Sequence, residues 1–219
     1  GGPIVRGYSE VAGAFPNSQG GGSMEATSFG RVVSHFEAMG SGSIDLDVDI
    51  HISGDLAGGN FFTGSLGNVT SAAGFEAKLH TAAGSFSLFN GNALFDVSSN
   101  SNSSQLTATG DWSASDFSAY SPSGGFNNQG RRVNLNDLNN DVAFVNAGDI
   151  FAIELVLDTS VFAAGPFEAA ALADFDSTGA VTLSTSTPGA SFVQIAVPEP
   201  ASAVLVGVLF LGLIVRRRM

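Results

Sequence analysis

Three aspartates at alternate positions, Asp45, Asp47 and Asp49 in the run "SIDLDVDIHIS", are the first side chains that could do chemistry. Alternate residues of a β-strand face the same side, so these carboxylates would form a ladder about 6.6 to 7 Å apart. Ca²⁺ prefers such oxygens, but it needs about six to eight of them, which a straight strand does not supply alone. The ladder predicts a solvated acidic face. A calcium site closed by a neighbouring loop is the alternative.

The other side chains that commonly carry catalysis lack the spacing that catalysis needs. His35, His51 and His80 lie in separate strand-like segments, without the HExxH arrangement of a zinc site. "GSLG" at residues 64–67 lacks the GxSxG elbow of a serine hydrolase. We therefore predict a non-enzymatic protein without a resident cofactor. A pair of carboxylates for glycoside hydrolysis depends on the fold, so a secreted hydrolase remains a less favoured alternative.

A polar segment over residues 121–141, "SPSGGFNNQGRRVNLNDLNND", is predicted to be a long loop. It holds the adjacent pair Arg131 and Arg132, which we expect to balance nearby acids such as Asp137 and Asp141. Large aromatic rings in or near this segment could stack on sugar rings, although rings of this size are more often buried in a core. They are Trp112, Tyr120 and Phe126.

Alternation of apolar and polar residues predicts the strands that must position these groups. In residues 43–53 it places Ile44, Leu46, Val48, Ile50 and Ile52 on one face, opposite the aspartates. Residues 149–159, "DIFAIELVLDT", repeat the pattern. Shorter β-rich runs are predicted near 28–37, 60–66, 74–81, 84–89, 92–98, 104–109, 168–175, 180–186 and 191–197.

Clusters of glycine, asparagine and serine separate these runs and favour turns over crossover helices. Two of the clusters, "NSQGGGSMEA" from Asn17 and "SSNSNSSQ" from Ser98, are predicted to be loops. Regularly spaced short strands are typical of an antiparallel sandwich or jelly roll. The sequence therefore predicts one all-β domain over residues 1–196.

Charge is distributed unevenly along the 219 residues, which carry a net charge of −12. Three of the eight basic residues are Arg216, Arg217 and Arg218, so the rest of the chain is more acidic still. An acidic surface repels phosphate backbones, which excludes nucleic acid as a partner. There is no cysteine, so disulfides and thiolate metal sites are excluded as well.

The C-terminal segment, residues 197–219, has the features of a membrane span. Ala201–Val215 carries no charge, and as a helix it would cover about 22 Å of the roughly 30 Å hydrocarbon core. Pro198 and Pro200 stop a helix from extending backwards, while the three arginines can snorkel to the headgroups. Arginine stays on the cytoplasmic side. The pattern predicts a C-terminal transmembrane helix with its end inside the cell and the acidic domain outside.

The order of these features resembles the PEP-CTERM sorting signal of exopolysaccharide-producing Gram-negative bacteria. Pro198, Glu199 and Pro200 match its PEP box, Ala201–Val215 its apolar span, and Arg216–Arg218 its basic stop. The upstream run "ALADFDSTGAVTLS" is also similar to the stretch that often precedes such signals, through Asp174, Phe175 and Thr178. The resemblance implies that a membrane-embedded exosortase cuts near the box and passes the domain to the cell surface or matrix.

A precursor of this kind would begin with a signal peptide, whereas the sequence starts "GGPIVRGYSE", so we expect that the signal peptide is missing from it. The function that follows is an exported surface or extracellular-matrix protein with a structural or adhesive role in the exopolysaccharide. A lectin-like module that binds carbohydrate, with Ca²⁺ assisting, is the alternative. The expected partners are the exosortase and the exopolysaccharide.

Overall fold

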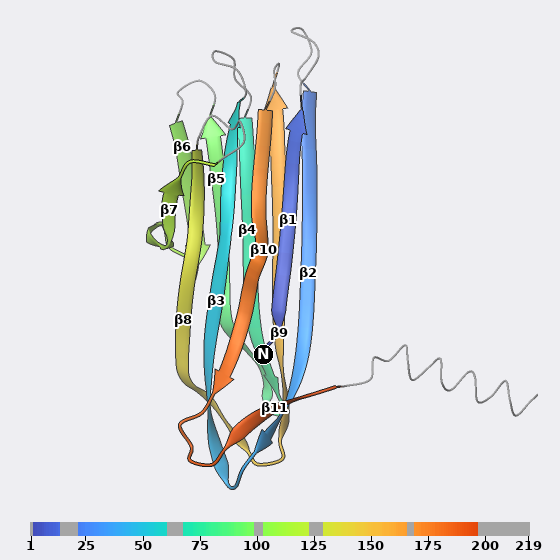
Figure 1. Cartoon of the computed structure of the whole chain (residues 1–219), viewed down its shortest axis with the longest axis vertical. Helices are drawn as coiled ribbons and strands as arrows, with labels where there is room; N and C mark the ends of the chain where they lie inside the picture. The colour runs from blue at the N-terminus through green and yellow to red at the C-terminus, as the bar shows by residue number, and fades with distance from the viewer. Residues whose placement is uncertain are drawn as a thin grey trace, which may run out of the picture.

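A computed structural model shows two antiparallel β-sheets packed face to face (Figure 1). The structure describes residues 2–13, 22–60, 68–98, 103–122, 129–165 and 169–196. Sheet A has the strand order β1-β10-β3-β8-β7, and sheet B has the order β11-β2-β9-β4-β5-β6. The prediction of an all-β antiparallel sandwich is confirmed.

The strands of sheet A are β1 (Ile4–Gly13), β3 (Ser43–Asn60), β7 (Phe117–Tyr120), β8 (Gln129–Asn146) and β10 (Ala169–Ser184). Those of sheet B are β2 (Gly22–Met39), β4 (Asn68–Thr81), β5 (Gly84–Ser98), β6 (Ser103–Gly110), β9 (Ile150–Gly165) and β11 (Ser191–Ile195). One turn of 3₁₀ helix, η1 (Ala114–Asp116), precedes β7. Within the described ranges, none of the helical structure has the length and apolar character that crossing a membrane requires.

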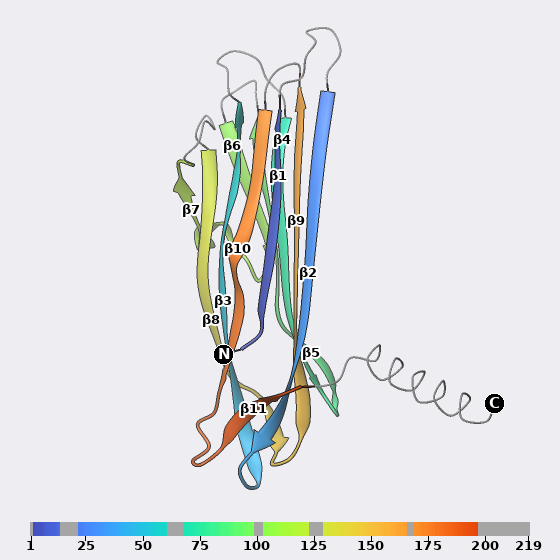
Figure 2. The same ribbon diagram turned by 45° about the vertical axis from the view of Figure 1, so that its right-hand side comes forward.

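The sandwich is elongated along its strands (Figures 1 and 2). Strands β2, β3 and β8 have 18 residues each, so each extends about 60 Å. Tight turns at one end carry the chain from β2 to β3 and from β8 to β9, from one sheet to the other. The short strand β11 lies at this same end, where it pairs with the last residues of β2.

The predicted alternation is confirmed in the strands for which it was clearest. All five apolar residues of β3 from Ile44 to Ile52 are fully buried between the sheets. Phe151, Ile153, Leu155 and Leu157 of β9 are buried in the same way. The core is rich in phenylalanine, and its largest fully buried side chains include Phe75, Phe89, Phe95, Phe151 and Phe175.

Several strands are longer than predicted, because glycines read as breaks lie inside them. The runs 84–89 and 92–98 form the single strand β5, and the runs 168–175 and 180–186 form β10. A Cβ atom at Gly91 would lie 2.8 Å from the ring of Trp112, and one at Gly179 would lie 2.3 Å from the ring of Phe75. These glycines provide room for aromatic rings and do not end the strands.

The predicted loop over residues 121–141 is wrong for most of its length, because strand β8 begins at Gln129. Its polar residues conceal an alternation in which Val133 and Leu135 face the core while Arg132 and Asn134 face outward. The predicted loops from Asn17 and Ser98 likewise give way to β2 at Gly22 and to β6 at Ser103. The predicted strand near 60–66 falls outside the described residues after Asn60.

Candidate functional site

The sorting-signal residues Pro198, Glu199, Pro200 and Arg216–Arg218 lie outside the described residues, as do the rest of residues 197–219. What the structure describes is the strand that leads to them. Strand β11 pairs antiparallel with β2, from Ser191 opposite Met39 to Ile195 opposite His35. Its last residue, Ile195, precedes Pro198 by three positions. The fold therefore places β11, the last described strand, at one end of the sandwich (Figure 2).

Asp45 anchors the connection from β10 to β11. Its Oδ2 atom accepts hydrogen bonds from the backbone N–H and the hydroxyl of Ser186, both at 2.8 Å, and its Oδ1 atom accepts one from Thr185 at 3.0 Å. The Thr187 hydroxyl also donates to Oδ1 and accepts from the Asp45 N–H. These donors, the Thr187 hydroxyl above all, hold the pKa of the carboxyl well below its usual range.

The expectation of a solvated aspartate ladder is wrong at Asp45, whose surface is only 7% exposed. Residues 185–187 bond to it and cover it, whereas Asp47 and Asp49 are half-buried further along the same face. Among the described residues, no three histidine, aspartate or glutamate side chains gather so that they could hold a metal ion. The calcium alternative gains no geometric support from this part of the chain.

A line of outward-facing residues crosses sheet A at one level, and we call it the sheet A row. The strand register places Tyr8 of β1 opposite Asp174, Asp174 opposite Asp55, Asp55 opposite Arg132, and Arg132 opposite Ser118 of β7. Directly opposite side chains on one sheet face are close enough to interact. The row therefore brings together groups that are far apart in the sequence.

Arg132 and Asp55 form a two-pronged ion pair within this row. The guanidinium Nε and Nη2 atoms donate to the two carboxylate oxygens, each at 2.7 Å. The guanidinium carbon also lies 4.8 Å from the ring centre of Tyr120. Asp55 raises the pKa of Arg132, and burial raises the pKa of the Tyr120 hydroxyl. At the other end of the row, the Tyr8 hydroxyl donates to Glu10, which raises the pKa of Tyr8 to about 12.

The expectation that an acid balances the arginine pair is confirmed for Arg132, and the acid is Asp55 on the adjacent strand. The side chains of Asp137 and Asp141 lie outside the described residues. Arg131 faces the other way: its guanidinium lies 5.3 Å from the ring centre of Phe95 and donates to the Gly130 carbonyl at 3.1 Å. Because successive side chains of a strand point to opposite faces of the sheet, Arg131 and Arg132 lie on opposite faces of β8.

A shallow hollow of about 200 Å³ opens beside the Arg132–Asp55 pair. It is lined by Ser53, Gly54, Asp55, Arg132, Val133, Asn134 and Asp174. The register of β10 against β3 jumps here from Asp174 opposite Asp55 to Gly179 opposite Ile52. The extra residues of β10 form a bulge, and bulges often stand next to functional sites.

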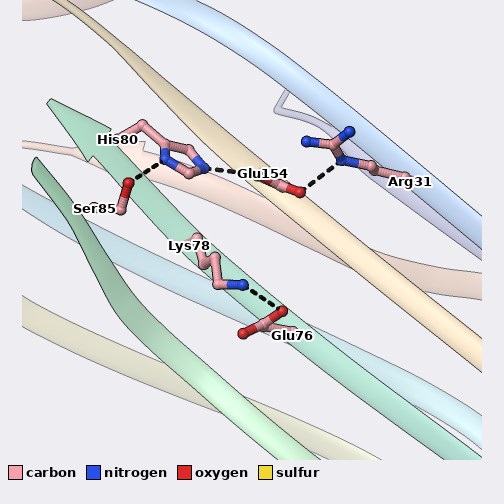
Figure 3. A network of polar contacts seen from close by, with 6 residues as sticks. All are labelled: Arg31, Glu76, Lys78, His80, Ser85 and Glu154. Atoms are coloured by element: carbon pink, nitrogen blue, oxygen red, sulfur yellow. Dashed lines mark hydrogen bonds and ion pairs between the residues drawn. The ribbon is translucent and has the colours of Figure 1, made fainter.

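A second polar network lies on the outer face of sheet B (Figure 3). His80 of β4 bonds through Nδ1 to the Ser85 hydroxyl at 2.7 Å and through Nε2 to Glu154 Oε2 at 2.8 Å. The other oxygen of Glu154 accepts from Arg31 Nε at 2.6 Å. Arg31, followed by His80, lowers the pKa of Glu154. Lys78 pairs with Glu76 beside this network, at 2.7 Å.

The order Ser85–His80–Glu154 matches the hydrogen-bond pattern of a serine nucleophile with its base and acid. Acyl transfer also needs donors aimed at the developing oxyanion, and none is among the described contacts of Ser85. Glu154 instead links β9 to β2 and β4 through its two partners. With Ser85 of β5 bonded to His80, the network ties together four neighbouring strands of sheet B. Sequence reasoning missed it because its members meet only through the strand register.

Trp112 is not placed to stack on a sugar, because it is only 2% exposed. Its ring packs edge-on against Phe89 and Phe117, with centroids 6.0 and 5.5 Å away. Phe126 lies outside the described residues. Tyr120 is half-buried over Gly130 and beside Arg132, so it is the one of the three predicted rings that the described structure places next to polar surface groups.

No protein-family model, curated protein sequence or solved structure matches this chain.

Proposed function

We propose that this chain is an exported protein of the cell surface or extracellular matrix, sorted by its C-terminal segment and acting without catalysis. The observation that carries the proposal is the order of Pro198-Glu199-Pro200, the uncharged run Ala201–Val215, and Arg216–Arg218. An exosortase recognises and cuts this segment after the arginines have fixed its orientation in the membrane. The β-sandwich then remains outside the cell.

The described fold is compatible with delivery from one end. The C-terminal segment follows β11 directly, and β11 lies at the end of a sandwich about 60 Å long. The Asp45 contacts hold the connection before β11 against β3. A domain held in this way extends from the membrane along its strands until the segment is cut.

Carbohydrate binding by the domain is a second function that a specific observation favours, namely the sheet A row with its adjacent hollow. The hydrolase alternative is less well supported there. Asp55 and Asp174 are cross-strand neighbours, which suits a pair of catalytic carboxylates by distance. However, Arg132 holds both oxygens of Asp55, which leaves Asp55 poorly placed to donate a proton or to attack a sugar carbon. The row supports binding better than turnover.

Replacing Arg216–Arg218 with glutamates tests the proposed topology. We expect the amount of protein that reaches the cell surface to fall at least about tenfold, because acidic residues do not act as a cytoplasmic stop. Quantitative immunoblotting of surface, membrane and soluble fractions measures this. The matched control replaces the same three residues with lysines, which keep the charge and should sort normally. Normal processing of the glutamate variant would reject the proposal.

A further inference from the structure

We propose that the outer face of sheet A binds a neutral polysaccharide chain along the sheet A row, with Arg132 and Asn134 bonding its hydroxyls and Tyr8 contacting a sugar ring. This inference rests on the proposed function, because it names the matrix component that the exported domain would hold. It assigns the site to one face of the sandwich, with the contacting side chains on two of its strands, β1 and β8.

The size of the row fits an extended ligand. From Tyr8 on β1 to Arg132 on β8 there are three steps between neighbouring strands, which amount to about 14 Å. The hollow of about 200 Å³ lies within this span, between β10 and β8. It is below the usual volume of a pocket for a drug-sized ligand, and it is open to the surface. A chain molecule that places one ring in the hollow and its neighbours on the flanking surface suits this shape.

The polar groups that line the hollow are suited to hydrogen bonding with neighbouring hydroxyl groups of a sugar ring. Arg132 has five N–H donors, and its described hydrogen bonds to Asp55 use two of them, so the guanidinium has more donors than this ion pair needs. The ion pair and the Tyr120 ring hold the guanidinium in place, which reduces the entropy lost on binding. Asn134 lies beside Arg132 on the same face and adds an amide that both donates and accepts.

Tyr8 supplies an apolar surface at the other end of the row. Its side chain lies on the outer face of β1, and the residue is 48% exposed. The hydroxyl bonds to Glu10, which fixes the direction of the ring. An aromatic ring with one polar end is well suited to a ligand that is apolar on its faces and polar at its edges.

The charge around the row selects an uncharged ligand. Three carboxylates, those of Glu10, Asp174 and Asp55, lie along the row with the guanidinium of Arg132. Arg6, exposed on the same face of β1, adds one more positive charge near Tyr8, so the carboxylates still outnumber the cations. The chain as a whole has a net charge of −12. Polyuronates and other anionic chains are therefore repelled, while neutral hexose polymers are not.

Affinity electrophoresis of the full chain in a zwitterionic, sugar-free detergent tests the proposal. The probes are gels that contain dextran, a β-glucan, a mannan or a galactan, compared with gels that contain alginate. We expect at least one neutral polymer to retard the wild-type chain and alginate to have no effect. Arg132→Lys and Asn134→Ala should each weaken the association at least about fivefold, since each removes bonds to the ligand. Arg132→Lys removes the planar guanidinium that donates to both oxygens of Asp55. Asn134→Ala leaves the Arg132–Asp55 ion pair intact.

The matched control is Arg31→Lys, since Arg31 has a similar side-chain exposure, 57% against 55%, and pairs with Glu154 on sheet B. It should bind like the wild type, and thermal melts should show all three variants folded. The proposal is overturned if no neutral polymer retards the chain, if alginate retards it more strongly, or if Arg31→Lys weakens binding as much as Arg132→Lys. Because the purified chain is used, these outcomes do not depend on sorting.

Discussion

A single added methyl group at Gly54 is expected to destabilise the sandwich nearly as much as the removal of a whole phenyl ring. A Cβ atom there would lie 2.3 Å from the ring of Phe175, which is fully buried. The ring packs near Trp112, with centroids 6.4 Å apart, so it has little room to move. We expect Gly54→Ala to lower the free energy of unfolding by about 3 kcal/mol, which corresponds to a fall in Tm of roughly 6–12 °C.

A double-mutant cycle distinguishes this clash from a general intolerance of β3 to substitution. Phe175→Ala alone should cost about 3–5 kcal/mol, because it empties a ring-sized space in the core. In that background Gly54→Ala should cost less than about 1 kcal/mol, since the atoms it would meet are gone. Circular-dichroism melts of the four chains measure the cycle. Additive losses would contradict the packing of Phe175 on Gly54.

Removal of the Asp45 carboxylate is expected to have the second largest effect on the fold. Asp45→Asn leaves several donors of the segment 185–187 without their charged acceptor inside a largely buried contact. We expect Tm to fall by about 5 °C or more, and residues 185–195 to exchange amide hydrogens faster. Asp49→Asn is the matched control, because Asp49 lies on the same strand and face without these contacts. It should change Tm by about 1 °C at most.

The difference between the wild type and Asp45→Asn should depend on pH. The pKa of Asp45 is lower in the folded chain than the ordinary value of about 3.9 in the unfolded chain. Its stabilising contribution is therefore complete above about pH 4 and is lost as the pH falls toward the folded pKa. Melts between pH 7 and pH 3 should show the gap in Tm constant at first and shrinking below about pH 4. A gap that widens on acidification would contradict the contacts of Asp45.

The sequence predicts strands well where apolar and polar residues alternate strongly. It predicts strand length poorly where packing against side chains from elsewhere in the chain determines whether a strand continues. Residues 43–53 and 149–159 show five and four buried apolar residues at alternate positions, and both are strands. Gly91 and Gly179 look like breaks in the sequence, yet rings of Trp112 and Phe75 occupy the space beside them. No local pattern reveals such a ring, because it comes from elsewhere in the chain.

Register explains what the sequence could not predict about the candidate sites. Asp55, Arg132 and Asp174 each look like an isolated surface charge, and only the pairing of β8 and β10 with β3 brings them together. His80 and Glu154 meet in the same way through the pairing of β4 with β9. Alternation predicts which side of a strand a side chain lies on, and it places Asp45 on the outer side. Alternation cannot predict that a later segment of the chain covers that side.

The C-terminus of the mature protein tests the central claim most directly. If an exosortase removes the span as proposed, mass spectrometry of protein recovered from the cell surface should find a terminus near Pro198–Pro200, without Ala201–Val215. Glu199→Ala, which alters the recognition box, should leave a full-length form in the membrane fraction. Surface protein that still ends at Met219 would contradict the account, as would unchanged cleavage of Glu199→Ala.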